Sequence, residues 1–367
     1  MGHYDIHRAT CYVAVKIDAV GAGSVARGER SWGTVVMNMV LPMAGVISRP
    51  RNRVATRLIM EMQVDGVATL MGAFGGNFDR AIIFFALLRE SSDIRRCATG
   101  TVNAEYGQRP GMSVNALAAS LARPFETVRR HVNALIEAGL CVRDGQQVRA
   151  AEDAAERPAI APVLRRLHDI MVRLAEDMAS FDLPLPPTRA RETHDAQATV
   201  AAAIDMLLTA IEFHAPQHPE WLEVIVYGAV MVANARPYSY DPVLANIYSE
   251  SDTVPPESLR LPVATAALAR ALHQPYSTIG RHIVRMVADG RLVRREGGVM
   301  IATDWMQTPS QTAGARIIAE RTAQIFARLA ASGFAFDMPG RLYCDGRPAL
   351  VDFGPRHEVK RALPLAA

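Results

Sequence analysis

Lysine is almost absent from this chain, and its absence excludes one large class of enzymes. Lys16 and Lys360 are the only lysines, so arginine supplies nearly all of the 40 basic residues. A Walker A phosphate-binding loop needs Gly-Lys followed by Ser or Thr, and neither lysine has that setting. The strings HExxH and GxSxG do not occur either. We therefore expect a protein that is not an enzyme and uses no cofactor.

Cysteine is also scarce and shows no paired spacing. The four cysteines, Cys11, Cys97, Cys141 and Cys344, lie far apart in the sequence. Zinc sites and disulfide frameworks need closely spaced or paired cysteines. The sequence thus predicts no metal site and a reducing compartment, the cytoplasm.

A long uninterrupted hydrophobic run is missing as well. Ser31–Ser48 carries no charge, but two glycines and a proline interrupt it and arginines flank both ends. These features argue against a membrane span, and we expect no membrane association. We expect residues 1–70 to be poorly ordered or to lie upstream of the true start, with order beginning near Phe78.

The overall composition is that of a folded protein with no general affinity for polyanions. Half of the residues are hydrophobic, 21% are charged, and the formal net charge is only +3. A chain of 367 residues can form two or three domains. A GC-rich genome is the simplest explanation for the preference for arginine, so any basic surface must be local.

An internal repeat gives the clearest information about organisation. Residues 117–143 read LAASLARPFETVRRHVNALIEAGLCVR and residues 268–294 read LARALHQPYSTIGRHIVRMVADGRLVR. The two segments align without a gap at a constant offset of 151 residues. Identical pairs are Leu117 with Leu268, Leu121 with Leu272, Pro124 with Pro275, Thr127 with Thr278, Arg130 with Arg281, His131 with His282, and Gly139 with Gly290.

The similarity extends beyond this segment, because each copy follows an apolar helical stretch and precedes another helix. The closing helices end in related tetrapeptides, Phe181–Pro184 and Phe336–Pro339. We therefore predict two duplicated units separated by a Pro-rich stretch. The predicted boundaries are an N-terminal segment 1–70, a first unit 71–190 with its motif at 112–150, a second unit 191–340 with its motif at 262–302, and a C-terminal tail 341–367.

Within each copy, the apolar spacing predicts two short helices followed by a β-hairpin. Val114, Leu117 and Leu121 share one helical face, and Pro124 can open the next helix. That helix should stop at Gly139, which suits a left-handed C-terminal cap. Short strands around a turn at 144–145 then complete the pattern. The predicted fold class is therefore mainly α, with two winged helix-turn-helix units related by internal duplication.

The second helix of such a motif can enter the major groove of DNA with its N-terminal residues at the base edges. Arginine suits guanine, glutamate suits cytosine, and apolar groups suit the thymine methyl. Arginines one turn further along and in the hairpins are placed for phosphates. The candidate DNA-binding residues are Arg123, Phe125, Glu126, Thr127, Arg129, Arg130, Arg143 and Arg149 in the first copy, and Gln274, Tyr276, Ser277, Thr278, Arg281, Arg294 and Arg295 in the second.

The string TVRRHVNALIEAGLCVR resembles the recognition helix and following strand of MarR-type bacterial winged-helix regulators. STIGRHIVRMVADGRLVRR is similar to a second, diverged copy. The resemblance covers about 40 residues in each half and implies double-stranded DNA as the partner. Gly280 stands where the first copy has Arg129, which puts base reading by the second copy in question.

The leading interpretation is a cytoplasmic, nucleoid-associated bacterial transcriptional regulator, with a homodimer possible through the apolar helices. Two alternatives remain open. A plasmid-type replication initiator also pairs two winged helices in one chain, and a winged-helix scaffold would bind only proteins. His214 and His218 are spaced like metal ligands, but the neighbouring prolines favour the end of a loop.

Overall fold

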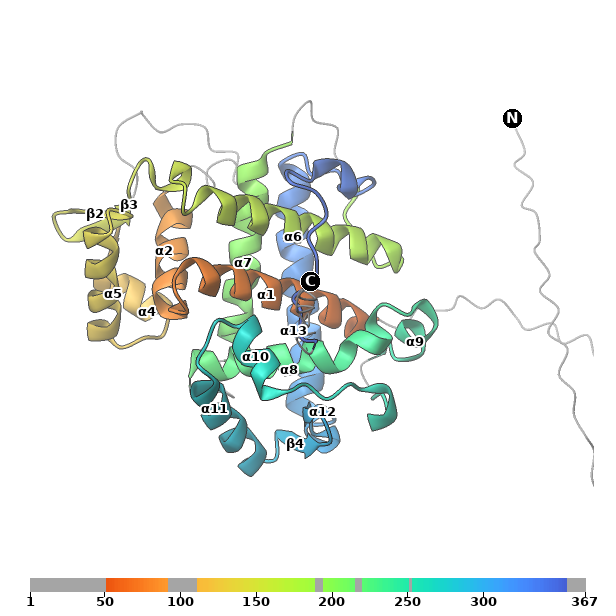
Figure 1. The fold of residues 1–367 in the computed structure, drawn as a ribbon. Coiled ribbons are helices and arrows are strands. Elements are labelled where there is room, and N and C mark those ends of the chain that lie inside the picture. The colour runs from red at the N-terminus through yellow and green to blue at the C-terminus, as the bar shows by residue number, and fades with distance from the viewer. Residues whose placement is uncertain (1–50, 92–110, 189–193, 215–219, 251–252, 355–367) are drawn as a thin grey trace, which may run out of the picture. The chain divides into compact units, whose positions relative to one another are not determined.

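The computed structural model describes residues 51–91, 111–188, 194–214, 220–250 and 253–354, and their fold is mainly helical (Figure 1). The uncharged stretch Ser31–Ser48 and His218 lie outside the described residues. Within the described ranges, no single helix is long and apolar enough to cross a membrane. One bent helix pair, Asn52–Ala73 with Phe78–Glu90, passes that test by length and composition alone.

The first half of the described chain contains two helices, a helix–helix–hairpin segment and a closing helix. The elements are α1 (Asn52–Ala73), α2 (Phe78–Ser91), β1 (Met112–Ser113), α4 (Val114–Ser120), α5 (Phe125–Glu137), β2 (Cys141–Asp144), β3 (Gln147–Ala150), η1 (Ala154–Glu156) and α6 (Ala161–Ser180).

The second half repeats this order with insertions. Its elements are α7 (Ala196–His214), α8 (Trp221–Ser239), α9 (Pro242–Ile247), η2 (Glu257–Leu259), α10 (Thr265–Ala271), α11 (Tyr276–Ala288), β4 (Leu292–Arg295), β5 (Gly298–Ile301), α12 (Thr303–Met306), α13 (Pro309–Ala331) and η3 (Pro339–Leu342).

The repeat is preserved in the backbone down to single positions. In the first copy β1 joins β3, with Met112 opposite Val148, and in the second a single bridge joins Val263 to Val299. Both partners of the bridge are 151 residues after their counterparts. Both predicted hairpins are present, as β2–β3 and β4–β5.

The turns of the two copies also have the same unusual backbone angles. Gly139 and Gly290, which end α5 and α11, have φ values of +70° and +72°. These are left-handed values that glycine adopts without strain, as predicted for the caps. Ala122 and His273 occupy equivalent places between the two motif helices, and both have φ of +49°. Each copy therefore uses the same tight turn between its helices.

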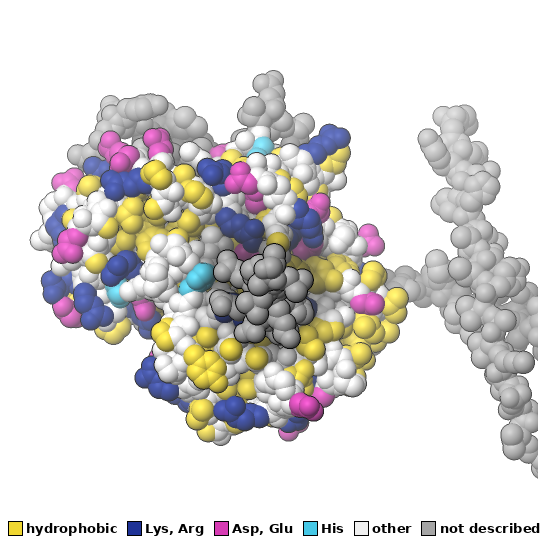
Figure 2. Space-filling view, viewed as in Figure 1, with side chains coloured by type: hydrophobic (Ala, Val, Ile, Leu, Met, Phe, Trp, Pro, Cys, Tyr) yellow, Lys and Arg dark blue, Asp and Glu magenta, His cyan; other side chains and the backbone are white. Residues whose placement is uncertain are grey.

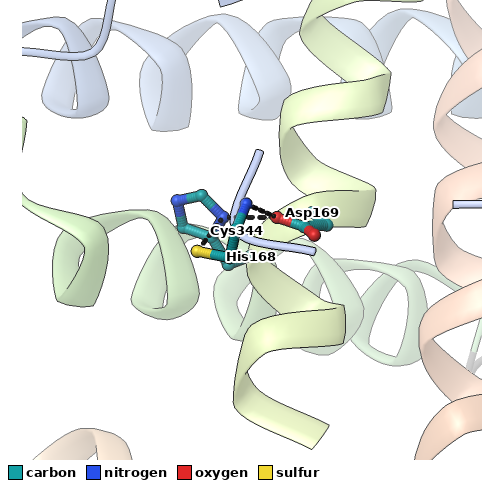
Figure 3. A group of neighbouring side chains, drawn as sticks. All are labelled: His168, Asp169 and Cys344. Atoms are coloured by element: carbon teal, nitrogen blue, oxygen red, sulfur yellow. Dashed lines mark hydrogen bonds and ion pairs between the residues drawn. The ribbon is translucent and has the colours of Figure 1, made fainter. Parts of the chain in front are cut away.

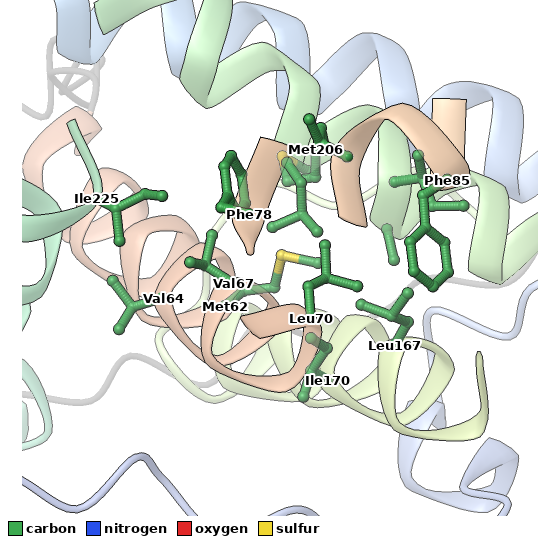
Figure 4. Close-up of a cluster of buried hydrophobic side chains, with 14 of the residues drawn as sticks. Met62, Val64, Val67, Leu70, Phe78, Phe85, Leu167, Ile170, Met206 and Ile225 are labelled. Carbon is green, nitrogen blue, oxygen red and sulfur yellow. The ribbon is translucent and has the colours of Figure 1, made fainter. Parts of the chain in front are cut away.

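The two halves share one hydrophobic core rather than forming separate ones. By chain order α1 corresponds to α7, and α6 to α13. Helix α6 packs against α7, and reciprocally α13 packs against α1. Buried side chains of α1, α2, α6, α7 and α8 meet in this core (Figure 4). Such reciprocal packing is what a twofold homodimer interface would show, here within a single chain.

The equivalent apolar helices α2 and α8 also meet at their first residues. The rings of Phe78 and Trp221 pack edge to face, with centroids 5.9 Å apart. The first residues of the two equivalent helices thus contact each other, as residues near an approximate twofold axis would.

The expectation of a poorly ordered segment up to residue 70 differs from the structure over residues 52–70. These residues belong to α1, which lies in the shared core. The helix is hard to recognise because it buries charged residues among its apolar ones. Glu61 pairs with Arg236 at 2.5 Å, and Asp65 pairs with Arg173 at 3.1 Å. Those arginines come from distant helices, so α1 has no simple polar face.

Candidate nucleic-acid interface

Helix α5 is strongly two-faced, and its apolar face holds it against the body of the protein. Its buried residues are Val128, His131, Val132 and Leu135, at helical spacing. The opposite face is exposed, and Phe125 at its first turn is 46% accessible. An aromatic ring is therefore accessible at the start of this exposed face.

Helix α11 repeats this design. Its buried residues are Ile279, His282, Ile283 and Met286. Tyr276, the equivalent of Phe125, is 63% accessible, and Val284 is 57% accessible. Ser277 is exposed and Thr278 half-buried. Both copies thus present an aromatic residue at the start of an exposed helical face.

The outer face of α5 carries an ion pair and an unpaired arginine. Arg129 and Glu126 are joined by two hydrogen bonds of 2.6 and 2.7 Å, and both side chains are exposed. Arg130 and its equivalent Arg281 are exposed, and among the described residues neither has a hydrogen-bonding or ionic partner. Thr127 is half-buried. The conserved arginine of the repeat is therefore available to an anion in both copies.

Two candidate DNA-binding residues, Arg123 and Gln274, make contacts within the protein instead. Arg123 pairs with Asp79 at 2.6 Å, and its guanidinium lies 3.9 Å from the centre of the Trp221 ring. Gln274 donates to the backbone carbonyl of Gly76 at 2.6 Å. Both side chains tie the turn before the second motif helix to the α1–α2 region, so they fix the orientation of α5 and α11.

The arginines of the two hairpins differ in whether a neighbouring side chain binds them. Arg294 is exposed, and within the described ranges no group pairs with it, whereas Arg295 makes a bidentate pair with Glu257 at 2.8 and 2.9 Å. Arg143 donates to Asn133 at 3.2 Å, and half-buried Arg149 lies 3.7 Å from Glu152. The hairpins therefore offer arginines that are mostly held in place by neighbouring side chains.

A buried acidic residue anchors the second copy to the core. Glu223, in the first turn of α8, is fully buried and lies 2.5 Å from Arg291 and 3.3 Å from Arg285. The neighbouring Glu220 accepts from Arg285, which lowers the pKa of that carboxyl. These contacts join the start of α8 to the last turn of α11 and to Arg291 just beyond it, so they orient the exposed face of α11.

The equivalent histidines His131 and His282 lie on the buried sides of α5 and α11. Burial lowers the pKa of both imidazoles. His282 lies 3.8 Å from Glu220 and 3.9 Å from Glu223. The structure therefore places both imidazoles on the side of their helix that packs against the protein.

The two copies meet at a common cleft of about 430 Å³. It is lined by Arg130 and His131 of α5, by the turn 273–275 that precedes α11, by residues 75–79 between α1 and α2, and by Met71, Trp221 and Leu222. Because α5 and the turn that precedes α11 both border this cleft, a single ligand there would contact both copies.

The face of the molecule in Figure 2 carries both basic and acidic side chains. In the view of Figure 2, basic side chains lie along the edge formed by α4, α5 and the first hairpin, and again over α11, with acidic side chains between them. The pattern agrees with the small net charge of +3. Any electrostatic attraction to an anion is therefore local to the two motif copies.

One further group of chemically active side chains was not predicted from the sequence. His168 and Asp169 of α6 lie beside Cys344, which follows η3 (Figure 3). Only the adjacent His-Asp pair could have been noticed, since Cys344 is 176 residues from His168. Burial and the carboxylates of Asp169 and Asp345 raise the pKa of the Cys344 thiol, which argues against an activated nucleophile.

No protein-family model, curated protein or solved structure matches the chain. Function must therefore be inferred from the arrangement of its own residues.

Proposed function

We propose that the chain is a sequence-specific, double-stranded DNA-binding regulator that uses two winged helix-turn-helix modules. The observation that carries the proposal is the duplicated exposed face of α5 and α11. Each begins with an accessible aromatic residue and carries the repeat arginine, Arg130 or Arg281, with no partner among the described residues. Each is followed by a hairpin with exposed arginine.

The chemistry of these faces suits a duplex. Arginines bind phosphates and the guanine edge, and aromatic or methyl groups contact thymine. The Glu126–Arg129 pair is exposed, so it contributes little to stability and exchanges readily for contacts with base edges. Arg123 and Gln274, which are held internally, set the helix orientation in this proposal and do not read bases.

The shared core supports a binding mode in which one chain replaces a dimer. Dimeric regulators present two recognition helices related by a twofold axis to two half-sites about 34 Å apart. The reciprocal packing of the halves, α6 on α7 and α13 on α1, supports a comparable arrangement within one chain. We therefore expect an imperfect inverted repeat, because Arg129 is replaced by Gly280 and Phe125 by Tyr276.

The test begins with selection of bound duplexes from a random library by the intact chain. Affinity for the selected duplex is then measured at several salt concentrations. Arg130→Ala and Arg281→Ala should each weaken binding to all duplexes alike and make the salt dependence shallower by about one phosphate contact. Arg129→Ala should instead relax preference at one base pair, by roughly tenfold.

The matched control is Arg316→Ala, which removes an exposed arginine of α13, remote in sequence from both motifs and paired with Glu320. It should leave affinity unchanged. The proposal is wrong if the chain selects no sequence, or if the Arg130, Arg281 and Arg316 variants bind alike. Substitutions in the intact chain are required, because the shared core does not allow one half to be tested as a fragment.

A further inference from the structure

Three potential metal ligands from two distant segments converge on one point beside α6. The Nδ1 atom of His168 lies 2.9 Å from Asp169 Oδ1 and 3.4 Å from Cys344 Sγ (Figure 3). All three ligand atoms lie within 4.8 Å of one another. Separations of this size are those of ligands around one tetrahedral cation, for which metal–ligand bonds are about 2.0–2.3 Å.

The other side of the His168 ring has a partner that can accept a proton from it. His168 Nε2 lies 3.2 Å from His194 Nε2, which also lies 3.2 Å from the Thr199 hydroxyl. When His168 donates its Nε2 proton to His194, its Nδ1 carries a lone pair. That lone pair then faces a carboxylate and a sulfur. Metal-binding histidines commonly donate their second ring N–H in this manner.

The carboxylate of Asp169 is held in position by the segment that carries the cysteine. Its two oxygens accept the backbone N–H groups of Cys344 and Asp345, each at 2.8 Å. His168 and Asp169 are both buried, whereas Cys344 is exposed. The group is therefore rigid on its inner side and open to solvent on its outer side, where water can complete the coordination.

We propose that His168 Nδ1, Asp169 Oδ1 and Cys344 Sγ bind a divalent cation of the Zn²⁺ class. Imidazole, carboxylate and thiolate are ligands that zinc accepts together. Binding displaces the thiol proton to solvent. The thiolate and the carboxylate then neutralise the two charges of the metal, so that the metal and its three ligands carry no net charge.

Such a site would fasten the C-terminal segment to the body of the protein. From Cys344 this segment continues across the helices, where Arg173 donates to the carbonyl of Pro348 at 3.1 Å and Arg236 to that of Val351 at 2.5 Å. Arg270 of α10, in the second motif copy, donates to the carbonyl of Gly354. The bound cation would therefore stabilise a connection between α6 and α10.

Cobalt binding to the full-length, reduced, metal-free chain tests the proposal. Co²⁺ should bind at one ion per chain and produce the near-ultraviolet absorption of a thiolate–cobalt bond, and Zn²⁺ should displace it. Cys344→Ser should abolish the absorption, and His168→Gln should weaken binding at least tenfold. Circular dichroism establishes that each variant is folded, and exposed Cys344 tolerates replacement by serine.

Glu152→Gln is the matched control, since it removes an exposed carboxylate that is remote in sequence from all three ligands, and it should bind Co²⁺ like the parent. Absence of Co²⁺ binding would overturn the proposal and leave a His168–Asp169 hydrogen bond as the whole role of the pair. Binding that survives in Cys344→Ser and His168→Gln would overturn it too. Both readouts are independent of DNA, so this proposal and the proposed function fail separately.

Discussion

Replacing Glu223 by glutamine should destabilise the protein through the loss of a buried carboxylate. Glu223 is fully buried; its closest partner is Arg291, whose side chain is only 6% accessible, and Arg285 lies 3.3 Å away. Glutamine keeps the shape of the side chain but removes its charge. The guanidinium of Arg291 then remains buried, with the carboxylate of Asp289 2.6 Å away.

The size of the effect follows from this geometry. Removing one partner of a buried ion pair costs about 3–5 kcal/mol, because the other charge stays desolvated. Since Asp289 remains and glutamine can still accept a hydrogen bond, we expect the lower end, about 3 kcal/mol. A loss of this size is a large part of the free energy of unfolding of a typical protein, which is about 5–15 kcal/mol.

Urea unfolding followed by circular dichroism measures the change. The matched control is Glu320→Gln, which removes the carboxylate of an exposed pair with Arg316, 58% and 64% accessible. Exposed pairs contribute little, so this variant should unfold at nearly the same urea concentration as the parent. Equal midpoints for the Glu223 and Glu320 variants would refute the reasoning, because burial would then have no influence on the cost.

Two further predictions concern packing and pH. A Cβ at Gly66 would lie 2.8 Å from Leu207 Cδ2, so Gly66→Ala should lower the free energy of unfolding by about 1–3 kcal/mol. The space around Gly280 is open, so Gly280→Ala should raise the free energy of unfolding by about 0.5–1 kcal/mol. Equal shifts of the thermal unfolding midpoint in the two variants would contradict this account. Burial lowers the pKa of His131 and His282, so the unfolded chain binds more protons in acid. The contribution of these histidines to the free energy of unfolding should be constant above a pH of about 6.5 and fall below it. If the His131→Gln, His282→Gln double variant loses stability with falling pH as steeply as the parent, these histidines are not the cause of the loss.

The local pattern of the two motif copies could be read from the sequence because short-range rules determine it. Apolar residues at helical spacing predicted that Val114, Leu117 and Leu121 share one helical face, and all three are buried. The predicted caps at Gly139 and Gly290 have the left-handed backbone that glycine favours. Turn residues located both hairpins. Each of these features depends on residues a few positions apart, so the same local rules apply to both copies of the repeat.

What depends on distant partners could be decided only by the tertiary structure. Arg123 stands beside Phe125 in sequence like a DNA contact, yet Asp79 and Trp221 hold it internally. Helix α1 places Glu61 and Asp65 in the core, and only arginines of other helices make that burial tolerable. Each of these contacts joins residues far apart in the chain, and no rule of sequence spacing specifies which distant charged side chain will be the partner.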